Sequence, residues 1–430
     1  MIIDKNLKAL WSHIAPEKKR SLFFLLLLML IASFAEIVSI GAIVPFLAVL
    51  TDPSVLFSHP YMSSFISFFK LENPDELLLP MVIIFGLAAA IAGSIRWFLL
   101  KFSTTLAFAI GHDLSINIYK TTLFQPYSTH VGRNSSEIIN AISVKTTMII
   151  FGILIPIITI ISSTMMLVIV LSFLTILNPL VAIIVITGFS LIYSIIILYT
   201  KRRLYLAGEK IAFHSTEVIK SMQEGLGGIR DILIDGTQET YSEIYKNSDL
   251  SLRAAQRSNQ IIRETPRYLV EALGIILISW VAYFSLGKPD SLSSALPLLG
   301  ALALGTQRML PVIQSAYSSW GSVKGSMASL KDVLVLLDQP MPEKLNRSLP
   351  NPINYSKSIN LQNISFRYSE DSPWILDKIN INIFKGSKVG ILGETGSGKT
   401  TILDILMGLL EPSNGYLQID GNNINKENIR

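Results

Sequence analysis

The sequence predicts an α-helical membrane protein with six transmembrane helices, followed by the N-terminal part of an α/β domain with a phosphate-binding loop. Three observations support this fold class. Half of the 430 residues are hydrophobic and only 16% are charged, against about 25% in a typical soluble domain. Several apolar runs reach the length of about 20 residues that a bilayer-spanning helix needs. A glycine-rich stretch, GETGSGKT at 393–400, stands between a strand-like and a helix-like segment.

The first twenty residues are predicted to form an amphipathic helix. Their apolar side chains recur at positions that share one helical face, namely Ile3, Leu7, Leu10, Trp11 and Ile14. With lysines on the opposite face, residues 1–20 are expected to lie along the inner membrane surface. An ordinary packed helix is the alternative.

Six apolar runs are predicted to span the membrane. They are Leu22–Leu50, Leu78–Leu100, Met148–Leu177, Leu180–Tyr199, Tyr268–Leu286 and Leu296–Ile313. The first run is too long for the core of a signal peptide, so it is predicted to remain in the protein as a span.

The basic residues sort by membrane side. With the N-terminus inside, the three outer loops contain two Lys or Arg residues, Lys70 and Lys288, whereas the inner segments contain 32 of the 36. This asymmetry follows the positive-inside rule. It explains the net charge of +5 without nucleic acid as a partner, and the absence of cysteine excludes disulfides and thiolate chemistry.

Two long inner segments are predicted to be helices that break and restart. In the first, Pro126 interrupts the pattern and Asn134 is expected to cap the next helix, with Glu137 three residues further on. In the second, EGLGGIRD at 224–231 contains three glycines, each of which costs a helix about 1 kcal/mol relative to alanine. Both breaks are either contact points for a cytoplasmic domain or plain turns.

A linker separates the helices from the second domain. Residues 339–352 contain four prolines, and from residue 358 the segments ISFRY, INIF and VGILG are predicted to be short strands. The predicted organisation is an interfacial helix at 1–20, a membrane domain at 21–338, a linker at 339–357 and an incomplete α/β domain at 358–430.

The stretch 393–400 fits the phosphate-loop pattern G-x-x-x-x-G-K-[ST]. Gly393 and Gly398 let backbone N–H groups approach phosphate oxygens, Lys399 supplies a positive charge, and the Thr400 hydroxyl can hold a magnesium ion. The segment before the loop is strand-like, and TILDILMGLL after it has helical spacing, which is the context that this motif requires. A plain glycine-rich turn is the alternative. Tyr368, upstream of the loop, could stack on an adenine base or simply pack in a strand.

Four ionisable residues stand in the predicted spans, where charge is expensive and often functional. Glu36 and Arg308 lie well inside and are candidates for a substrate cavity, where the Arg308 guanidinium suits a diphosphate. The alternatives are an internal ion pair between these two or a solvated position. Arg96 and Glu271 lie near the inner ends of their spans and are expected to extend their charges to the surface.

Taken together, the spans, the broken inner loops, the linker and the phosphate loop resemble an ABC transporter of the fused exporter type. The resemblance is most specific in SFRY, INIFKG, GILGETGSGKTT and LEPSNGYLQIDG. It implies ATP and Mg²⁺ as cofactors, a homodimer, and a bacterial inner membrane location with the N-terminus and nucleotide domain in the cytoplasm. It further implies that Tyr368 stacks on adenine, that the two loop breaks are coupling helices, and that Thr400 binds Mg²⁺. The residues implied to contact ATP phosphates are Gly393, Glu394, Thr395, Gly396, Ser397, Gly398, Lys399, Thr400 and Thr401.

Within this family, three segments resemble lipid-linked oligosaccharide flippases: SFAEIVSIGAIVPFL at 33–47, PRYLVEALG at 266–274 and RMLP at 308–311. This resemblance implies ATP-driven movement of a lipid-linked glycan or another amphipathic lipid across the membrane. The alternatives are a drug or peptide exporter on the same fold, or a nucleotide-binding membrane protein that does not transport.

The sequence departs from the family after the phosphate loop. The glutamine loop, the signature, the Walker B segment and the switch histidine of the family are not among residues 358–430, so no catalytic residue is predicted in this chain. We expect a fragment or a truncated product that does not hydrolyse ATP by itself.

Overall fold

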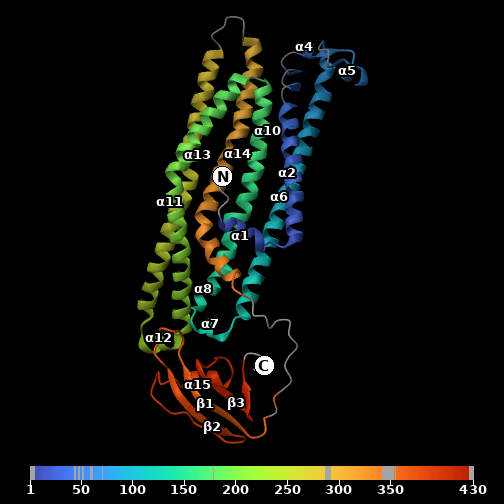
Figure 1. The fold of residues 1–430 in the computed structure, drawn as a ribbon. Helices are drawn as coiled ribbons and strands as arrows, with labels where there is room; N and C mark the ends of the chain where they lie inside the picture. The colour runs from blue at the N-terminus through green and yellow to red at the C-terminus, as the bar shows by residue number, and fades with distance from the viewer. Residues whose placement is uncertain are drawn as a thin grey trace. The chain divides into compact units, whose positions relative to one another are not determined.

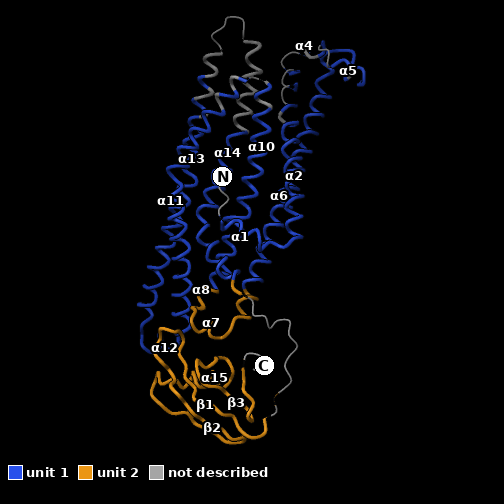
Figure 2. Tube along the Cα trace, viewed as in Figure 1, with its two compact units in different colours: residues 1–118, 139–338 blue, residues 119–138, 339–430 orange. Residues whose placement is uncertain are grey.

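The computed structural model describes residues 5–42, 45–46, 49–50, 53–58, 62–69, 71–177, 179–285, 292–340, 353 and 355–425. The side chains of some helical residues, including 281–285 and 292–308, are outside this description. The chain divides into two compact units, one of residues 1–118 and 139–338 and one of residues 119–138 and 339–430 (Figure 2). Most of the predicted linker, 341–352, lies outside the described residues.

Unit 1 is built from long helices joined by shorter ones, and the last turn of α6 extends past residue 118 into unit 2 (Figure 1). They are α1 (Lys5–His13), α2 (Pro16–Gly41), α4 (Pro53–Phe57), α5 (Ser63–Phe69), η2 (Pro74–Leu77), α6 (Leu78–Leu123), α10 (Ile155–Leu177), α11 (Pro179–Gly227), α12 (Ile229–Asp235), α13 (Gln238–Ser285) and α14 (Leu292–Leu337). Helices α11, α13 and α14 pack against one another, and α10 packs against α2, α11 and α14. A core of aliphatic side chains fills the space between α1, α2, α6, α10 and α14.

Three helical segments among the described residues are long and apolar enough to cross a membrane: Pro16–Ser39, Pro74–Leu123 and Ser135–Ser172. They contain the first three predicted spans except the part of the first beyond Ser39 and the part of the third beyond Ser172. The other three predicted spans lie in α11, α13 and α14, apart from Leu286, which is not described. The helical character of the membrane domain is therefore confirmed, whereas the count of six spans stays a prediction.

The N-terminal helix is shorter than predicted. Helix α1 ends at His13, and α2 begins at Pro16. Proline has no N–H to donate and disfavours helical geometry in the residue before it, so the chain bends at residues 14 and 15 and the predicted single helix over 1–20 is wrong. Leu10 and Ile14 are nevertheless buried in the core of unit 1.

Both predicted helix breaks are present. Pro126 stands before the short helix α7 (Tyr127–Val131), and Gly132 ends it. The Asn134 side chain then accepts a hydrogen bond of 3.0 Å from the Ser136 N–H, which caps α8 (Ser135–Asn140) as predicted. In the second segment, α11 ends at Gly227, and Gly228 is the N-cap of α12, which begins at Ile229.

The helix that follows α8 contains two wide turns that the sequence did not indicate. η3 (Ala141–Lys145) and η4 (Ile150–Leu154) are π-helical, with α9 (Thr146–Ile149) between them. Segments of this type are rare and frequently lie at functional sites. The neighbouring helices approach closely, because a Cβ atom on Gly152 would lie 2.0 Å from the Ser326 hydroxyl of α14.

In unit 2, residues 358–424 form an antiparallel sheet of order β2-β1-β3-β4 with one helix on it. Its elements are β1 (Ser358–Phe366), β2 (Leu376–Phe384), β3 (Asn414–Ile419), β4 (Asn422–Ile424) and α15 (Lys399–Leu406). Ile402 and Ile405 of α15 are buried with Leu361 and Ile364 of β1. Residues 119–138, including α7, cluster with this domain rather than with the other helices.

The prediction of a strand at VGILG, residues 389–393, is wrong in this structure. A strand requires a ladder of hydrogen bonds to a neighbouring strand. The ladders of the described sheet pair β1 with β2, β1 with β3 and β3 with β4, and none of them includes residues 389–393. Ile391 packs against the core of unit 2, whereas Leu392 is 97% exposed, so the segment contacts the core through one side chain without pairing as a strand.

Asp420 fastens the start of β1 to the turn between β3 and β4. Its carboxylate accepts hydrogen bonds from the N–H groups of Ser356, Lys357 and Ser358 and from the Ser356 hydroxyl. Burial acts to raise the pKa of Asp420, but these four donors outweigh it and hold the pKa well below its usual value.

Candidate functional site

The lysine of the phosphate loop is folded back onto the loop itself. The Lys399 ammonium donates hydrogen bonds to the carbonyl oxygens of Gly393, at 2.7 Å, and of Glu394, at 2.6 Å. The positive charge of Lys399 thus lies within the loop that the sequence predicts to bind phosphate. The same ring-shaped loop is closed by the Ser397 N–H, which donates to the Glu394 carbonyl at 3.2 Å.

Two glycines of the loop have backbone geometry that other residues rarely adopt. Gly396 and Gly398 have φ angles of +87° and +85°, in the region where a Cβ atom is strained. A Cβ atom on Gly398 would also lie 2.8 Å from Leu376 of β2. Glycine at 398 therefore lets α15 begin directly against the sheet.

The N-terminus of α15 offers free backbone donors. Its first intrahelical bond runs from the Ile402 N–H to the Gly398 carbonyl at 3.0 Å, so the N–H groups of residues 399–401 have no acceptor within the helix. Such donors, together with the helix dipole and Lys399, match the negative oxygens of a nucleotide phosphate. The exposed Thr400 hydroxyl beside them fits the predicted Mg²⁺ ligand.

The predicted adenine residue lies beside the loop. The Tyr368 hydroxyl is 3.5 Å from the Thr401 hydroxyl, and its ring packs edge-on against Phe366 with centroids 5.0 Å apart. Tyr368 remains 46% exposed, so the residue is partly accessible to solvent beside the loop. Thr401 itself is buried, which places its side chain against Tyr368 and not on the open side of the loop.

Among the ionisable residues predicted in the spans, Glu36 and Glu271 each form an ion pair within the membrane domain. The Glu36 carboxylate lies 3.1 Å from the Arg96 guanidinium, and Glu36 is 1% exposed. Arg308 lies in α14, but its side chain is outside the described part of the chain, so a pair between Glu36 and Arg308 stays a prediction. Glu271 pairs with Arg267 at 2.9 Å.

Comparison with known protein families agrees with this geometry. The ABC transporter transmembrane region matches residues 21–287, which is more than half of the chain. The chain belongs to the ABC transporter family. The ABC transporter nucleotide domain matches residues 376–430, which include the whole phosphate loop. Membrane and nucleotide regions thus share one polypeptide, as in fused ABC exporters.

Curated relatives of this ABC transporter chain have different substrates in their names. The ATP-dependent lipid A-core flippase of Alkalilimnicola ehrlichii is 22% identical over 242 residues, covering 54% of this chain and 39% of the relative. The alpha-hemolysin translocation ATP-binding protein of Escherichia coli is 37% identical over 123 residues, covering 28% of this chain and 17% of the relative. The vacuolar heme ABC transmembrane exporter of Schizosaccharomyces pombe is 27% identical over 213 residues, covering 48% and 14%. The chain therefore spans less than half the length of these ABC relatives.

A polar cavity of about 350 Å³ in the ABC membrane domain was missed by the sequence analysis. Arg263, Arg267 and Glu271 of α13 line it together with Gln314 and Tyr317 of α14. The Arg263 guanidinium donates to the Ser318 carbonyl and hydroxyl at 3.2 and 3.3 Å. The spacing of Arg263, Arg267 and Glu271 at every fourth residue was the available signal, because it places them on one helical face.

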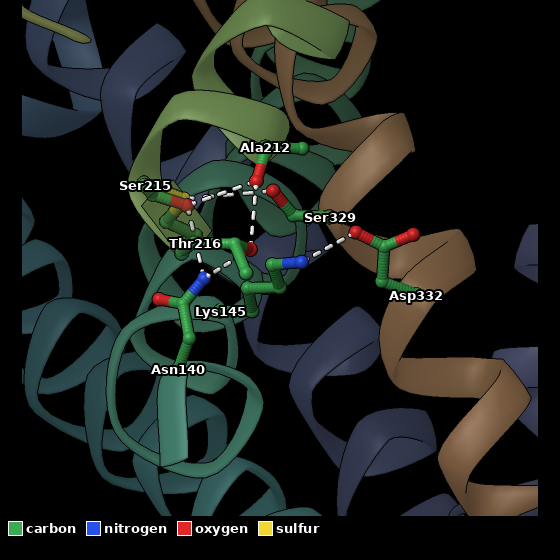
Figure 3. Close-up of polar contacts among 8 residues, drawn as sticks. Asn140, Lys145, Ala212, Ser215, Thr216, Ser329 and Asp332 are labelled. Carbon is green, nitrogen blue, oxygen red and sulfur yellow. Dashed lines mark hydrogen bonds and ion pairs between the residues drawn. The ribbon is translucent and has the colours of Figure 1, made fainter. Parts of the chain in front are cut away.

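A second polar cluster joins the wide turn η3 to two other helices (Figure 3). The Asn140 amide donates to the hydroxyls of Ser215 at 3.1 Å and Thr216 at 2.8 Å on α11. Lys145 points to Asp332 of α14, with 2.5 Å between its ammonium and the carboxylate. Sequence reasoning missed this cluster because its members lie 75 to 187 positions apart.

Proposed function

We propose that this chain is part of an ATP-driven ABC exporter that works as a homodimer in a bacterial inner membrane. The observation that carries the proposal is the phosphate loop, in which Lys399 and the free N–H groups of α15 converge, on the same polypeptide as an ABC membrane region. Neither a plain glycine-rich turn nor a purely structural membrane protein requires this convergence. The basic inner segments favour a cytoplasmic N-terminus and nucleotide domain.

Each residue of the proposed nucleotide site has a distinct task. Lys399 and the N–H groups at the start of α15 hold the phosphates, Thr400 holds Mg²⁺, and Tyr368 stacks on the adenine. Bound ATP supplies the free energy for transport through hydrolysis. The loop residues Gly393 to Thr401 position the phosphates, while the residues that cleave ATP are not among those predicted in this chain.

The two short helices α7 and α12 are proposed as the coupling elements of the transporter. Each stands between two long helices, at a break made by proline or glycine. The clustering of residues 119–138 with the nucleotide domain supports this assignment for α7. For α12 the proposal rests on its position in the chain alone.

The proposed substrate is a lipid-linked glycan or another amphipathic lipid. The similarity to a lipid A-core flippase supports a lipid substrate. The polar cavity is lined by Arg263 and Arg267 and also by Glu264 and Glu271, with Arg267 paired to Glu271. Its guanidinium groups suit a phosphate, and its balanced charge suits a polar head group with both donors and acceptors. Glu36 and Arg308 remain proposed cavity residues, with Glu36 held by Arg96.

A protein or peptide exporter is the second candidate. It is favoured by the 37% identity to a hemolysin translocation protein, although this match covers 28% of the chain. Nucleotide domains of transporters with different substrates share their phosphate loops, so this similarity bears more on ATP binding than on the cargo. Stimulation of ATP hydrolysis by a lipid-linked glycan, by peptides and by drugs separates these candidates.

The deciding experiment measures transport into proteoliposomes. They contain the protein purified, in the form in which it occurs, from its native membrane. Lys399→Ala is expected to abolish ATP-driven transport and nucleotide binding, whereas Lys388→Ala, an exposed lysine outside the motif, is expected to change neither. Undiminished ATP-driven transport by Lys399→Ala contradicts the proposal.

A further inference from the structure

We propose that this membrane protein binds an anionic phospholipid in an apolar cavity bounded by α1, α2, α6 and α10. The cavity has a volume of about 730 Å³, within the range of roughly 300–1,000 Å³ that is typical of ligand pockets. Its walls belong entirely to unit 1 and share no residue with the phosphate loop or with the polar cavity of Arg263. The inference requires only a membrane location and does not depend on the proposed transport function.

The interior of the cavity suits a hydrocarbon chain. Its walls include Leu26 and Met29 of α2 and Ile157, Ile158 and Ile161 of α10. These side chains are aliphatic or thioether, without hydrogen-bonding hydroxyl or amide groups. Such a surface favours an acyl chain, whose burial requires no polar partner.

The charged side chains of the cavity all have one sign. Among the described residues that line it, the charged ones are Lys8 of α1 and Lys19 of α2, with no carboxylate. Lys8 is exposed, and the Lys19 ammonium lies 5.5 Å from the centre of the Trp11 ring, which lines the same cavity. Two ammonium groups at an apolar cavity complement a phosphate attached to acyl chains.

The bend between α1 and α2 brings these groups together. Because Pro16 ends the first helix, α1 turns away from α2, and Leu7 and Leu10 face the same cavity as Lys19. Tryptophan and lysine are the residues that typically lie at the headgroup level of a membrane, with Trp11 half exposed here. A phospholipid fits this combination better than a protein helix, which would bring no obligatory negative charge to the lysines.

The test measures lipid binding at Trp11. The full chain is reconstituted in nanodiscs that contain phosphatidylglycerol or phosphatidylcholine with brominated acyl chains, which quench nearby tryptophan. The Trp11→Phe variant identifies the Trp11 contribution. We expect phosphatidylglycerol to quench Trp11 at a lower mole fraction than phosphatidylcholine does.

Matched variants separate the proposed site from general surface charge. Lys8→Gln with Lys19→Gln should weaken phosphatidylglycerol binding about 25-fold, at about fivefold for each lysine near the membrane surface. Lys5→Gln with Lys18→Gln removes the same charge from the same two helices but outside the cavity lining, and should leave binding within about twofold of wild type. Ile158→Phe, which fills the interior, should weaken binding while all lysines remain.

Three outcomes overturn the inference. The first is equal quenching by both lipids, which would indicate ordinary bilayer lipid. The second is equal loss in the two double variants, which would indicate diffuse surface charge. The third is displacement of the lipid by soluble glycerol phosphate, which would indicate a headgroup site without a role for the apolar interior.

Discussion

Lys145 and Asp332 form an ion pair in which the ammonium lies 2.5 Å from the carboxylate, joining η3 to α14. The two ends of the pair differ in solvent access, since the side chain of Lys145 is 7% exposed and that of Asp332 is 46% exposed. The lysine has therefore lost most of its hydration and depends on the aspartate for compensation.

Removing Asp332 should destabilise unit 1 more than removing both charges. Asp332→Ala leaves the buried ammonium unpaired, and we expect a loss of about 1–3 kcal/mol, below the value for a fully buried pair because Asp332 is partly solvated. Lys145→Met combined with Asp332→Ala removes both charges and should recover part of that loss. Denaturant unfolding in detergent, followed by circular dichroism, measures the difference.

The exposed pair Lys246–Glu243 is the control for this measurement. Its side chains are 71% and 59% exposed with 3.3 Å between the charged atoms, and Glu243→Ala should change stability by less than about 0.5 kcal/mol. An Asp332→Ala effect no larger than this control would show that Lys145 does not need its partner.

Gly208→Ala should destabilise the packing of α11 on α14. A Cβ atom at residue 208 would lie 2.2 Å from the backbone carbonyl oxygen of Gly325, so the helices must separate. We expect a loss of about 1–3 kcal/mol, as for other overpacked sites. Gly93→Ala is the control, because a Cβ atom there meets nothing within 4 Å, and it should be neutral or stabilising by up to about 1 kcal/mol. Thermal unfolding of both variants in the same detergent provides the comparison, and equal melting temperatures would refute the close approach.

Tyr368 is expected to contribute to nucleotide affinity through its ring and not through its hydroxyl. Tyr368→Ala should weaken ATP binding about 2- to 12-fold, which corresponds to the stabilisation of an aromatic pair. Tyr368→Phe keeps the ring and loses only the 3.5 Å contact with Thr401, so its affinity should stay near wild type. Titration with a fluorescent ATP analogue measures both, and equal loss in the two variants would assign the effect to the hydroxyl.

The clamp at Asp420 should make the stability of unit 2 depend on acid pH. The pKa of Asp420 is lowered in the folded state, so its stabilising contribution is present above the ordinary aspartate pKa of about 3.9. It is lost as the pH falls from there toward the lowered folded pKa. Asp420→Asn should therefore lower the melting temperature at pH 7, with a difference from wild type that shrinks below about pH 4. A difference that is constant from pH 7 to pH 3 would contradict the clamp.

Local features of the fold were predictable because their causes lie within a few residues. Asn134 caps α8 through a hydrogen bond two residues away, and Gly227 and Gly228 separate α11 from α12 as helix-breaking glycines should. The start of α15 at the phosphate loop was predictable for the same reason. The overlong helix at 1–20 was an avoidable error, since Pro16 itself indicated the break.

Features that depend on distant partners were not predictable. The strand expected at 389–393 has suitable residues, but a strand forms only where another strand pairs with it. Lys145 and Asp332 are 187 positions apart, and Arg96 could not be assigned to Glu36 without knowing how α2 and α6 lie. The sequence did not indicate the wide turns η3 and η4. At η4, close contacts of Gly111 with Ile150 and of Gly152 with Ser326 join residues far apart in the chain.

The two π-helical turns make the helix from Ser135 to Leu177 locally adjustable in the axial position and rotation of its residues. Each of them closes its hydrogen bonds one residue later than an α-turn does, so each contains one surplus residue. If a wide turn moved one position along the helix, the residue it passed would advance by about 1.5 Å along the axis and rotate by roughly a quarter turn. Ala141 to Lys145 and Ile150 to Leu154 are thus two points at which this rod can transmit a screw-like displacement while the helix on either side stays intact.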